Sequence, residues 1–326
     1  RTPPGRAWWG MVERAAQRVM LMRMAQPALM PNPRCLDSPP PGMMQLCHRE
    51  SVVQFINEVC EDFGLMTQTA GLAVSYFDRF LSKSERQGLD KHRVQLLAIT
   101  CTLIAAKFSE IKMPSLDDLC EVAHGLFTKA QLKETELETL RVLQWELHAV
   151  TPHAALEQLA VIMNHTDDQS KTFLEHAEFF IDMSYYVYQI LKFPPLVVAS
   201  SALLCAWSHL GNLKAIEFHM PQLCALCGVG KNDLLRCKML LHEYFNTTFP
   251  KAAEAAEMHR AASVAAGRES PDSVMVSATN LADIKPPPMK PMDKEAPNVP
   301  MDEDTPTDDD MNMDENAPEY CFSPVR

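Results

Sequence analysis

Two stretches of this chain, residues 94–108 and 196–207, are apolar on almost every side when they are read as helices. A helix without a polar face must be surrounded by other helices, because its side chains would otherwise meet water. Glycine is scarce, at 11 of 326 residues, and the apolar runs are rich in Met, Leu and Ala, which favours helices over sheets. The sequence therefore predicts an all-α protein of two units, each built around a buried central helix.

Amphipathic stretches flank the first central helix. Before it, apolar side chains recur at i, i+4, i+7 and i+11, the spacing of one helix face. They are Val52, Ile56, Val59 and Phe63. After it, Ser115 with Asp118 and Thr128 with Gln131 form capping-box patterns that predict two helix starts. The first unit therefore has about five helices.

The second unit is expected to open at Thr151-Pro152, with Thr as the N-cap and Pro at the first helical position. A motif that begins at Met113-Pro114 recurs 107 residues later at Met220-Pro221, which supports a duplication of the unit. Its five expected helical stretches are 152–163, 170–191, 195–210, 221–227 and 232–246.

Proline and charge are concentrated at the ends of the chain. Of 24 prolines, eight lie in residues 1–47 and ten in 251–326, and the latter segment carries −9 of the net charge of −12. A segment with few large apolar residues cannot offset its ordering entropy, so we expect this acidic tail to be disordered. The expected parts are an N-terminal helix and Pro-rich linker over 1–45, the two units over 46–150 and 151–250, and the tail over 251–326.

The segment 8–24 is apolar but contains three arginines. It is read either as an amphipathic helix that packs on the body or as a transit-like segment. No apolar run reaches the roughly 18 residues of a membrane span, so no membrane partner is expected. Because the chain begins with Arg1 instead of Met, we expect either that it is truncated or that its start has been assigned incorrectly, upstream of Met11.

Composition and motifs also bear on the function class. The mildly acidic middle of the chain argues against nucleic acid as a partner. Ten scattered cysteines indicate reduced thiols in the cytosol or nucleus. Zinc at the Cys224/Cys227 pair would need a second pair, for which only Cys237 and His219 lie near in sequence. A Gly-rich phosphate loop, HExxH and GxSxG are all absent, so we predict no catalytic residue, no cofactor and no metal.

Three segments together resemble the cyclin family. The second helix of the family is matched by residues 69–82, which contain Tyr76-Phe77-Asp78-Arg79-Phe80-Leu81. The third is matched by residues 95–111, which contain Ala105-Ala106-Lys107-Phe108, and the fifth by residues 136–147. The resemblance extends over about 46–250 and implies two tandem five-helix cyclin boxes. It also implies a regulatory subunit that binds and activates a cyclin-dependent Ser/Thr protein kinase to control cell-cycle progression at G1/S, in nucleus and cytoplasm.

The resemblance assigns roles to individual residues. Lys107 and Glu136 match the family's polar kinase contacts, and Arg49 with Asp78 matches a structural ion pair between the first two helices. The matching apolar kinase contacts are Ile104, Phe108, Leu140, Trp145 and Leu147. Taken singly these residues have plainer interpretations, since a lysine at a helix end suits the macrodipole and a buried aromatic side chain suits a core.

A second family site, a substrate-docking groove, is matched only in part. Its candidate positions are Val52, Glu58, Lys91 and Gln95, together with Phe55, which stands where the family usually has a Trp. However, His48 and Ser51 stand where the family has apolar lining residues, which puts this site in doubt. Residues 151–153 and 193–199 resemble the D-type G1 cyclins, whereas 107–111 resembles the mitotic A/B types; we favour the D type.

The termini carry motifs of regulation. Arg18-x-x-Leu21 fits a minimal destruction box, and phosphorylation is expected at Ser270, Thr305 and Ser323, each of which precedes a proline. Kinase inhibitors and substrate proteins are the further partners expected. The alternative functions are a cyclin-fold transcription factor, which should carry a basic DNA-binding face, and a scaffold that binds without activating a kinase.

Overall fold

The computed structural model describes residues 29–34, 46–83, 91–163 and 171–254, and every regular element within these ranges is helical. The segment 8–24, the acidic tail beyond residue 254 and the three expected phosphorylation sites lie outside the described residues. None of the described helices is long and apolar enough to cross a membrane.

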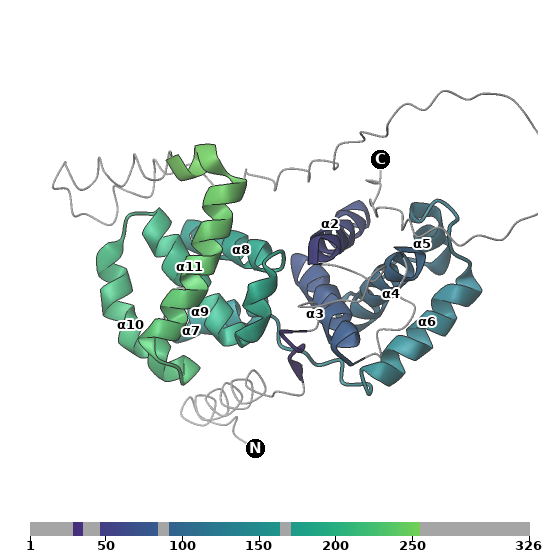
Figure 1. Ribbon diagram of the computed structural model, residues 1–326, viewed down its shortest axis with the longest axis horizontal. Helices are drawn as coiled ribbons and strands as arrows, with labels where there is room; N and C mark the ends of the chain where they lie inside the picture. The colour runs from purple at the N-terminus through teal and green to yellow at the C-terminus, as the bar shows by residue number, and fades with distance from the viewer. Residues whose placement is uncertain (1–28, 35–45, 84–90, 164–170, 255–326) are drawn as a thin grey trace, which may run out of the picture.

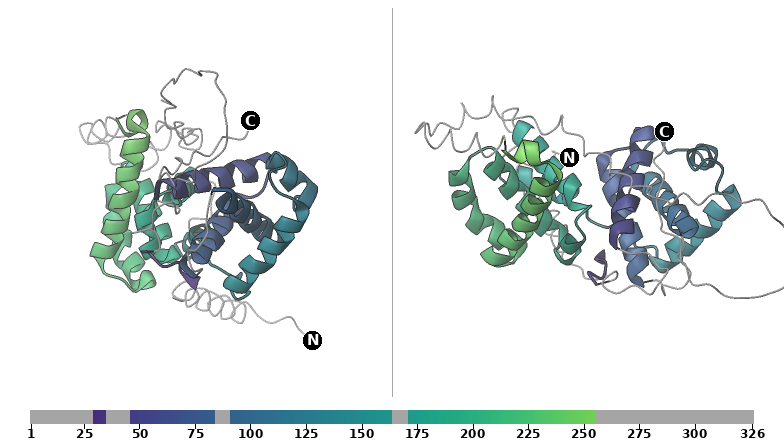
Figure 2. Two further views of the ribbon diagram at one scale, coloured as in Figure 1. Left: turned by 45° about the vertical axis from the view of Figure 1, so that its right-hand side comes forward. Right: turned by 45° about the horizontal axis from the view of Figure 1, so that its top comes forward.

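The helices form two units that lie side by side (Figure 1), and two further directions show the same separation (Figure 2). The first unit contains α2 (Leu46–Asp62), α3 (Thr67–Lys83), α4 (Lys91–Ser109), α5 (Leu116–Val122) and α6 (Lys129–Val142). The second contains α7 (Pro152–Ile162), α8 (Lys171–Ser184), a 3-10 turn η3 (Tyr188–Lys192), α9 (Pro195–His209), α10 (Leu213–Cys227) and α11 (Lys231–Thr248).

Each unit has its own core around the helix that the sequence predicts to be central. α4 packs against α2, α3 and α6, and α9 packs against α7, α8, α10 and α11. Every residue of α9 from Leu196 to His209 is buried. The prediction of two buried central helices is therefore confirmed.

Predicted helix starts hold where the signal is a local cap. Both capping boxes form, with the side chains of Ser115 and Thr128 accepting from the third backbone N–H of α5 and α6. The Thr151 side chain likewise caps α7 and accepts from the Ala154 N–H. Because these caps satisfy backbone donors that the helix leaves unpaired, the boundaries follow from the sequence alone.

Two predicted boundaries in the second unit are wrong. The helix expected over 170–191 ends at Ser184, where the next N–H groups bond three residues back and the Ser184 hydroxyl donates to the Ile181 carbonyl; η3 follows. The helix expected over 221–227 begins at Leu213, capped by the Asn212 side chain, and Pro221 lies inside it with its ring exposed. The repeated Met-Pro motif therefore marks a helix start only in the first unit.

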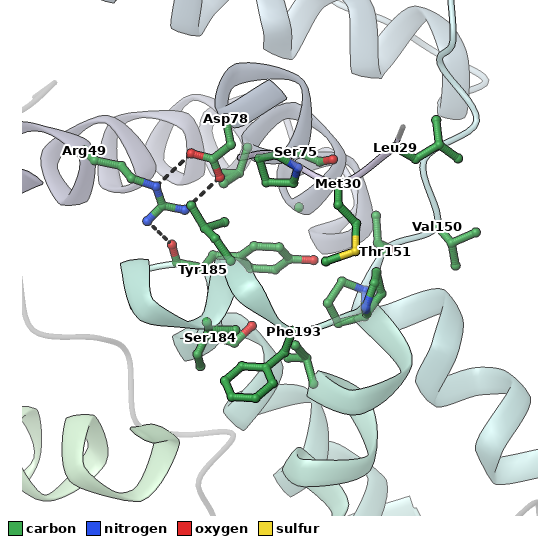
Figure 3. Close-up of a pocket in the computed structure, with 18 residues that line it drawn as sticks. Leu29, Met30, Arg49, Ser75, Asp78, Val150, Thr151, Ser184, Tyr185 and Phe193 are labelled. Carbon is green, nitrogen blue, oxygen red and sulfur yellow. Dashed lines mark hydrogen bonds and ion pairs between the residues drawn. The ribbon is translucent and has the colours of Figure 1, made fainter. Parts of the chain in front are cut away.

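Arg49 links the two units through hydrogen bonds to residues of both. Its Nε and Nη2 atoms donate to the two carboxylate oxygens of Asp78 at 2.8 Å each, and its Nη1 donates to the Tyr185 carbonyl at 2.8 Å (Figure 3). Beside this pair lies a cavity of about 90 Å³, lined by residues of both units and by Leu29 and Met30 (Figure 3). A Cβ at Gly71 would overlap the Tyr185 side chain, so the absence of a side chain at Gly71 permits Tyr185, the residue after α8, to lie against α3.

The first core also takes side chains from the second unit. Tyr186 and Tyr188, which follow α8, are buried in the core formed by α2–α6. The Tyr186 hydroxyl accepts from Asn57 Nδ2 at 2.8 Å and donates to Gln54 Oε1 at 2.9 Å. Both partners lie on α2, so this contact crosses from one unit to the other.

Candidate partner-binding surface

The end of α4 lies beside the middle of α6, where Lys107 and Glu136 form an ion pair. Lys107 Nζ and Glu136 Oε1 are 2.6 Å apart, and the two side chains are 38% and 17% exposed. An exposed pair of this kind adds about 0–1 kcal/mol to stability. Its main effect is to hold an ammonium and a carboxylate at one point of the surface, where both can still reach a partner.

Aromatic side chains are exposed at the end of α4 and after α6. Phe108 follows Lys107 and is exposed, with its ring edge-on to His148 at 4.8 Å between centroids. Trp145 is 63% exposed. Of the other predicted contacts, Ile104 is buried in the core, and Leu140 and Leu147 are half-buried against it. The predicted set therefore divides into an exposed part and a part that supports it from beneath.

Three exposed apolar residues of this region were missed from sequence. Ile111 and Met113 lie in the loop after α4, and Leu137 follows Glu136 on α6. The side chain of Ile111 is fully exposed. An apolar residue in a loop is a weak signal of a binding surface, because the sequence does not show whether the fold covers it.

The backbone after α6 presents Trp145 in an unusual conformation. Gln144 and Trp145 have φ angles of 57° and 58°, in the left-handed region that non-glycine residues rarely adopt. Each such residue costs roughly 1–2 kcal/mol. Hydrogen bonds hold the turn, from Trp145 N to the Leu140 carbonyl at 3.0 Å and from the Tyr76 hydroxyl to the Leu147 carbonyl at 2.7 Å. Backbone strain that is maintained in this way often marks a functional site.

Burial shifts the ionisation of residues beneath this surface. Desolvation raises the pKa of the Tyr76 phenol above its usual range, so the hydroxyl remains a donor to Leu147. Desolvation also lowers the pKa of the Arg79 guanidinium. Glu110, after α4, accepts from the Met66 N–H at 2.7 Å and from the Thr69 hydroxyl, which ties the loop to the start of α3.

The residues matched to a substrate-docking groove differ in their exposure. Val52 and Phe55 are buried in the first core, and Glu58 is half-buried and accepts from Gln54 Nε2 at 2.9 Å. Gln95 is half-buried, and the side chain of Lys91 lies outside the described residues. Substrate docking at these positions stays a prediction.

The CxxC pair lies at the end of α10. Cys227 Sγ lies 3.2 Å from Ser200 Oγ, and Cys224 is half-buried. Within the described ranges, no group of three or more His, Cys, Asp or Glu side chains is arranged to hold a metal ion.

Comparisons with known proteins agree with this architecture. The family described as "Cyclin, N-terminal domain" matches residues 18–148, and "Cyclin, C-terminal domain" matches 150–266. The chain is 31% identical over 204 residues to "Putative cyclin-A3-1" of Arabidopsis thaliana, covering 60% of this chain and 54% of that protein. It is 30% identical over 203 residues to "Cyclin-D1-2" of Oryza sativa subsp. japonica, covering 62% and 57%.

These matches do not separate the subtypes. A-type, G2/mitotic and D-type names occur at 30–31% identity, so the D-type preference stays a prediction. The chain spans little more than half the length of the two relatives above. In fold it is similar to the X-ray structure of a viral cyclin from herpesvirus saimiri, with a TM-score of 0.54 and 23% identity, covering 63% of this chain and 89% of that one. Two matched cyclin domains on two tandem helical units show that the chain belongs to the cyclin family.

Proposed function

We propose that this chain binds and activates a cyclin-dependent Ser/Thr protein kinase and supplies no catalytic group. The observation that carries the proposal is the surface where α4 ends beside α6. There Lys107, paired with Glu136, is followed by the exposed Phe108, whose ring packs on His148, three residues after the exposed Trp145. Tryptophan is enriched among the residues that dominate binding energy, and exposed apolar patches mark binding sites.

The activation follows from differential binding. A protein kinase is active only when its ATP-anchoring Lys meets a Glu on a mobile helix and its metal-binding Asp is in place. A partner that binds this arrangement better than the inactive one shifts the kinase toward it. Lys107 can donate to free carbonyls and Glu136 can accept from free N–H groups at the end of a kinase helix.

The test uses the full chain with a panel of cyclin-dependent kinases. Binding is measured by calorimetry, and activation by phosphorylation of a Ser-Pro peptide. The variant Lys107→Ala/Glu136→Ala should lose both while circular dichroism shows an unchanged helical content.

The chain supplies a matched control for this variant. Arg93 and Glu138 form an exposed pair at 2.7 Å between the same two helices, α4 and α6. Arg93→Ala/Glu138→Ala should bind and activate like the parent. If no kinase binds the parent, the function moves to a scaffold or a cyclin-fold transcription factor, and DNA binding becomes the next assay.

Finer parts of the function are also proposals. From the D-like segments we infer action at G1/S and contacts with kinase inhibitors and substrate proteins. From the cysteines, which suit a reducing compartment, we infer residence in nucleus and cytoplasm. Following the level and location of the tagged chain through synchronised cells tests the first two. Phosphorylation at Ser270, Thr305 and Ser323 is tested by mass spectrometry after incubation with the kinase.

A further inference from the structure

The first unit contains two fully buried arginines with opposite surroundings. All three donor groups of Arg49 have acceptors. Arg79, on α3, is 0% exposed, and none of its three guanidinium nitrogens has a hydrogen-bond partner. A buried charge without a partner is unfavourable, because neither water nor protein replaces its hydration shell. An anion next to the Arg79 guanidinium would therefore stabilise its buried charge.

The carboxylate placed to do this belongs to Glu146. Tyr76 precedes Arg79 by three residues, so the two side chains share a face of α3. The Tyr76 hydroxyl donates to the carbonyl of Leu147, the residue after Glu146. Desolvation lowers the pKa of the Arg79 guanidinium and that of the Lys83 ammonium, and the negative charge of Glu146 opposes both shifts. Glu146 is exposed, and its carboxylate makes no hydrogen bond or ion pair with any described residue.

Partner binding would change the surroundings of Glu146. Glu146 directly follows Trp145, which is exposed and held out by the left-handed turn. A protein that covers Trp145 removes water from the neighbouring carboxylate. The attraction between opposite charges becomes roughly fourfold stronger when the effective dielectric constant falls from about 80 to about 20.

We propose that Glu146 pairs with the buried Arg79 when the kinase covers Trp145, and that Arg79 is thereby a positioning residue for the partner-binding turn after α6. This inference rests on the proposed function. In the unbound chain the water around Glu146 competes with Arg79, and the pair stays open. In the complex the pair closes and fixes the turn that carries Trp145.

The experiment is a double-mutant cycle on the full chain, with affinity for the kinase measured by calorimetry and stability of the unbound chain by thermal unfolding. Glu146→Gln and Arg79→Met should each weaken binding roughly tenfold or more, and the double variant should lose little beyond either single one. Unbound Arg79→Met should melt at or above the temperature of the parent, since it removes an unpaired buried charge. A residue with only a structural role would instead lower both measurements together.

Two controls define the coupling. Glu134→Gln, an exposed acid on α6, should leave affinity unchanged. Lys83→Gln should leave the effect of Glu146→Gln intact, because Lys83 is exposed and remains hydrated.

Each contrary outcome has a definite meaning. If Glu146→Gln weakens binding equally with and without Arg79, the carboxylate contacts the kinase itself and the inference is overturned. If the effect of Glu146 disappears in the Lys83 variant, the pairing cation is Lys83 and the inference is again wrong. A parent that binds no kinase refutes the proposed function and this inference together, whereas equal binding by parent and variants refutes this inference alone.

Discussion

Removing the carboxylate of Asp78 should destabilise the whole chain severely. Asp78 accepts two parallel hydrogen bonds from Arg49, each 2.8 Å long, and the two side chains are at most 2% exposed. Asp78→Ala takes away the acceptor of two donors while the charge stays buried. Breaking a buried pair in this way costs about 3–5 kcal/mol, which is at least about a fifth of the roughly 5–15 kcal/mol that holds a typical protein folded.

Urea unfolding of the full chain, followed by circular dichroism, measures this loss. The midpoint should fall strongly for Asp78→Ala. The double variant Arg49→Met/Asp78→Leu should recover much of the loss, because no charge is left unpaired. Glu138→Ala, which breaks the exposed pair with Arg93, is the matched control and should cost at most about 1 kcal/mol. A cost below about 1 kcal/mol for Asp78→Ala would refute the view that burial makes this pair indispensable.

Three further changes have expected results. Gly71→Ala should cost about 1–3 kcal/mol in thermal unfolding, because the new methyl group overlaps Tyr185, and an unchanged melting temperature would show that the ring moves aside freely. Thr128→Ala removes an N-cap and should cost about 1 kcal/mol in urea unfolding, whereas a neutral result would mean that the start of α6 is held by packing. Burial raises the pKa of the Cys60 thiol to about 12 and that of Cys227 to about 11. Both thiols should therefore stay protonated and react slowly with an alkylating reagent in the native chain at pH 8, as a mass-spectrometric map would show. Stability should fall as the pH rises above about 9, because only the unfolded chain then loses these thiol protons. Rapid native labelling of either thiol would contradict the raised pKa values.

The helices that could be predicted from the sequence are those fixed by local signals. Apolar residues all round the two central helices require burial, and the capping boxes at Ser115 and Thr128 fix their own boundaries. The end of α8 could not be predicted, because apolar residues continue past Ser184 and the sequence does not show that Tyr186 and Ile190 are buried in different cores. The predicted start of α10 at residue 221 is too late, although its cap, Asn212, stands in the sequence.

The candidate site was predictable only as far as the family resemblance reached. That resemblance named Lys107 and Glu136, which the structure places 2.6 Å apart. It could not name Ile111, because exposure of an apolar loop residue depends on whether other elements cover it. Nor does a sequence indicate that Arg79 lacks hydrogen-bond partners, since the motif Asp78-Arg79 shows two adjacent charges, of which Asp78 pairs with Arg49 and the Arg79 guanidinium is left without a hydrogen bond.

The insertion of Tyr186 and Tyr188 into the first core has a consequence for the order of folding during synthesis. The first unit cannot complete its core when residue 150 leaves the ribosome, because two of its buried rings have not yet been made. Until then, the sites on α2 that receive Tyr186 remain open to water and to chaperones. Although each unit has its own core, the two units should therefore complete their folding together. A chain cut between them should leave a first unit that stays soluble only when a chaperone is present.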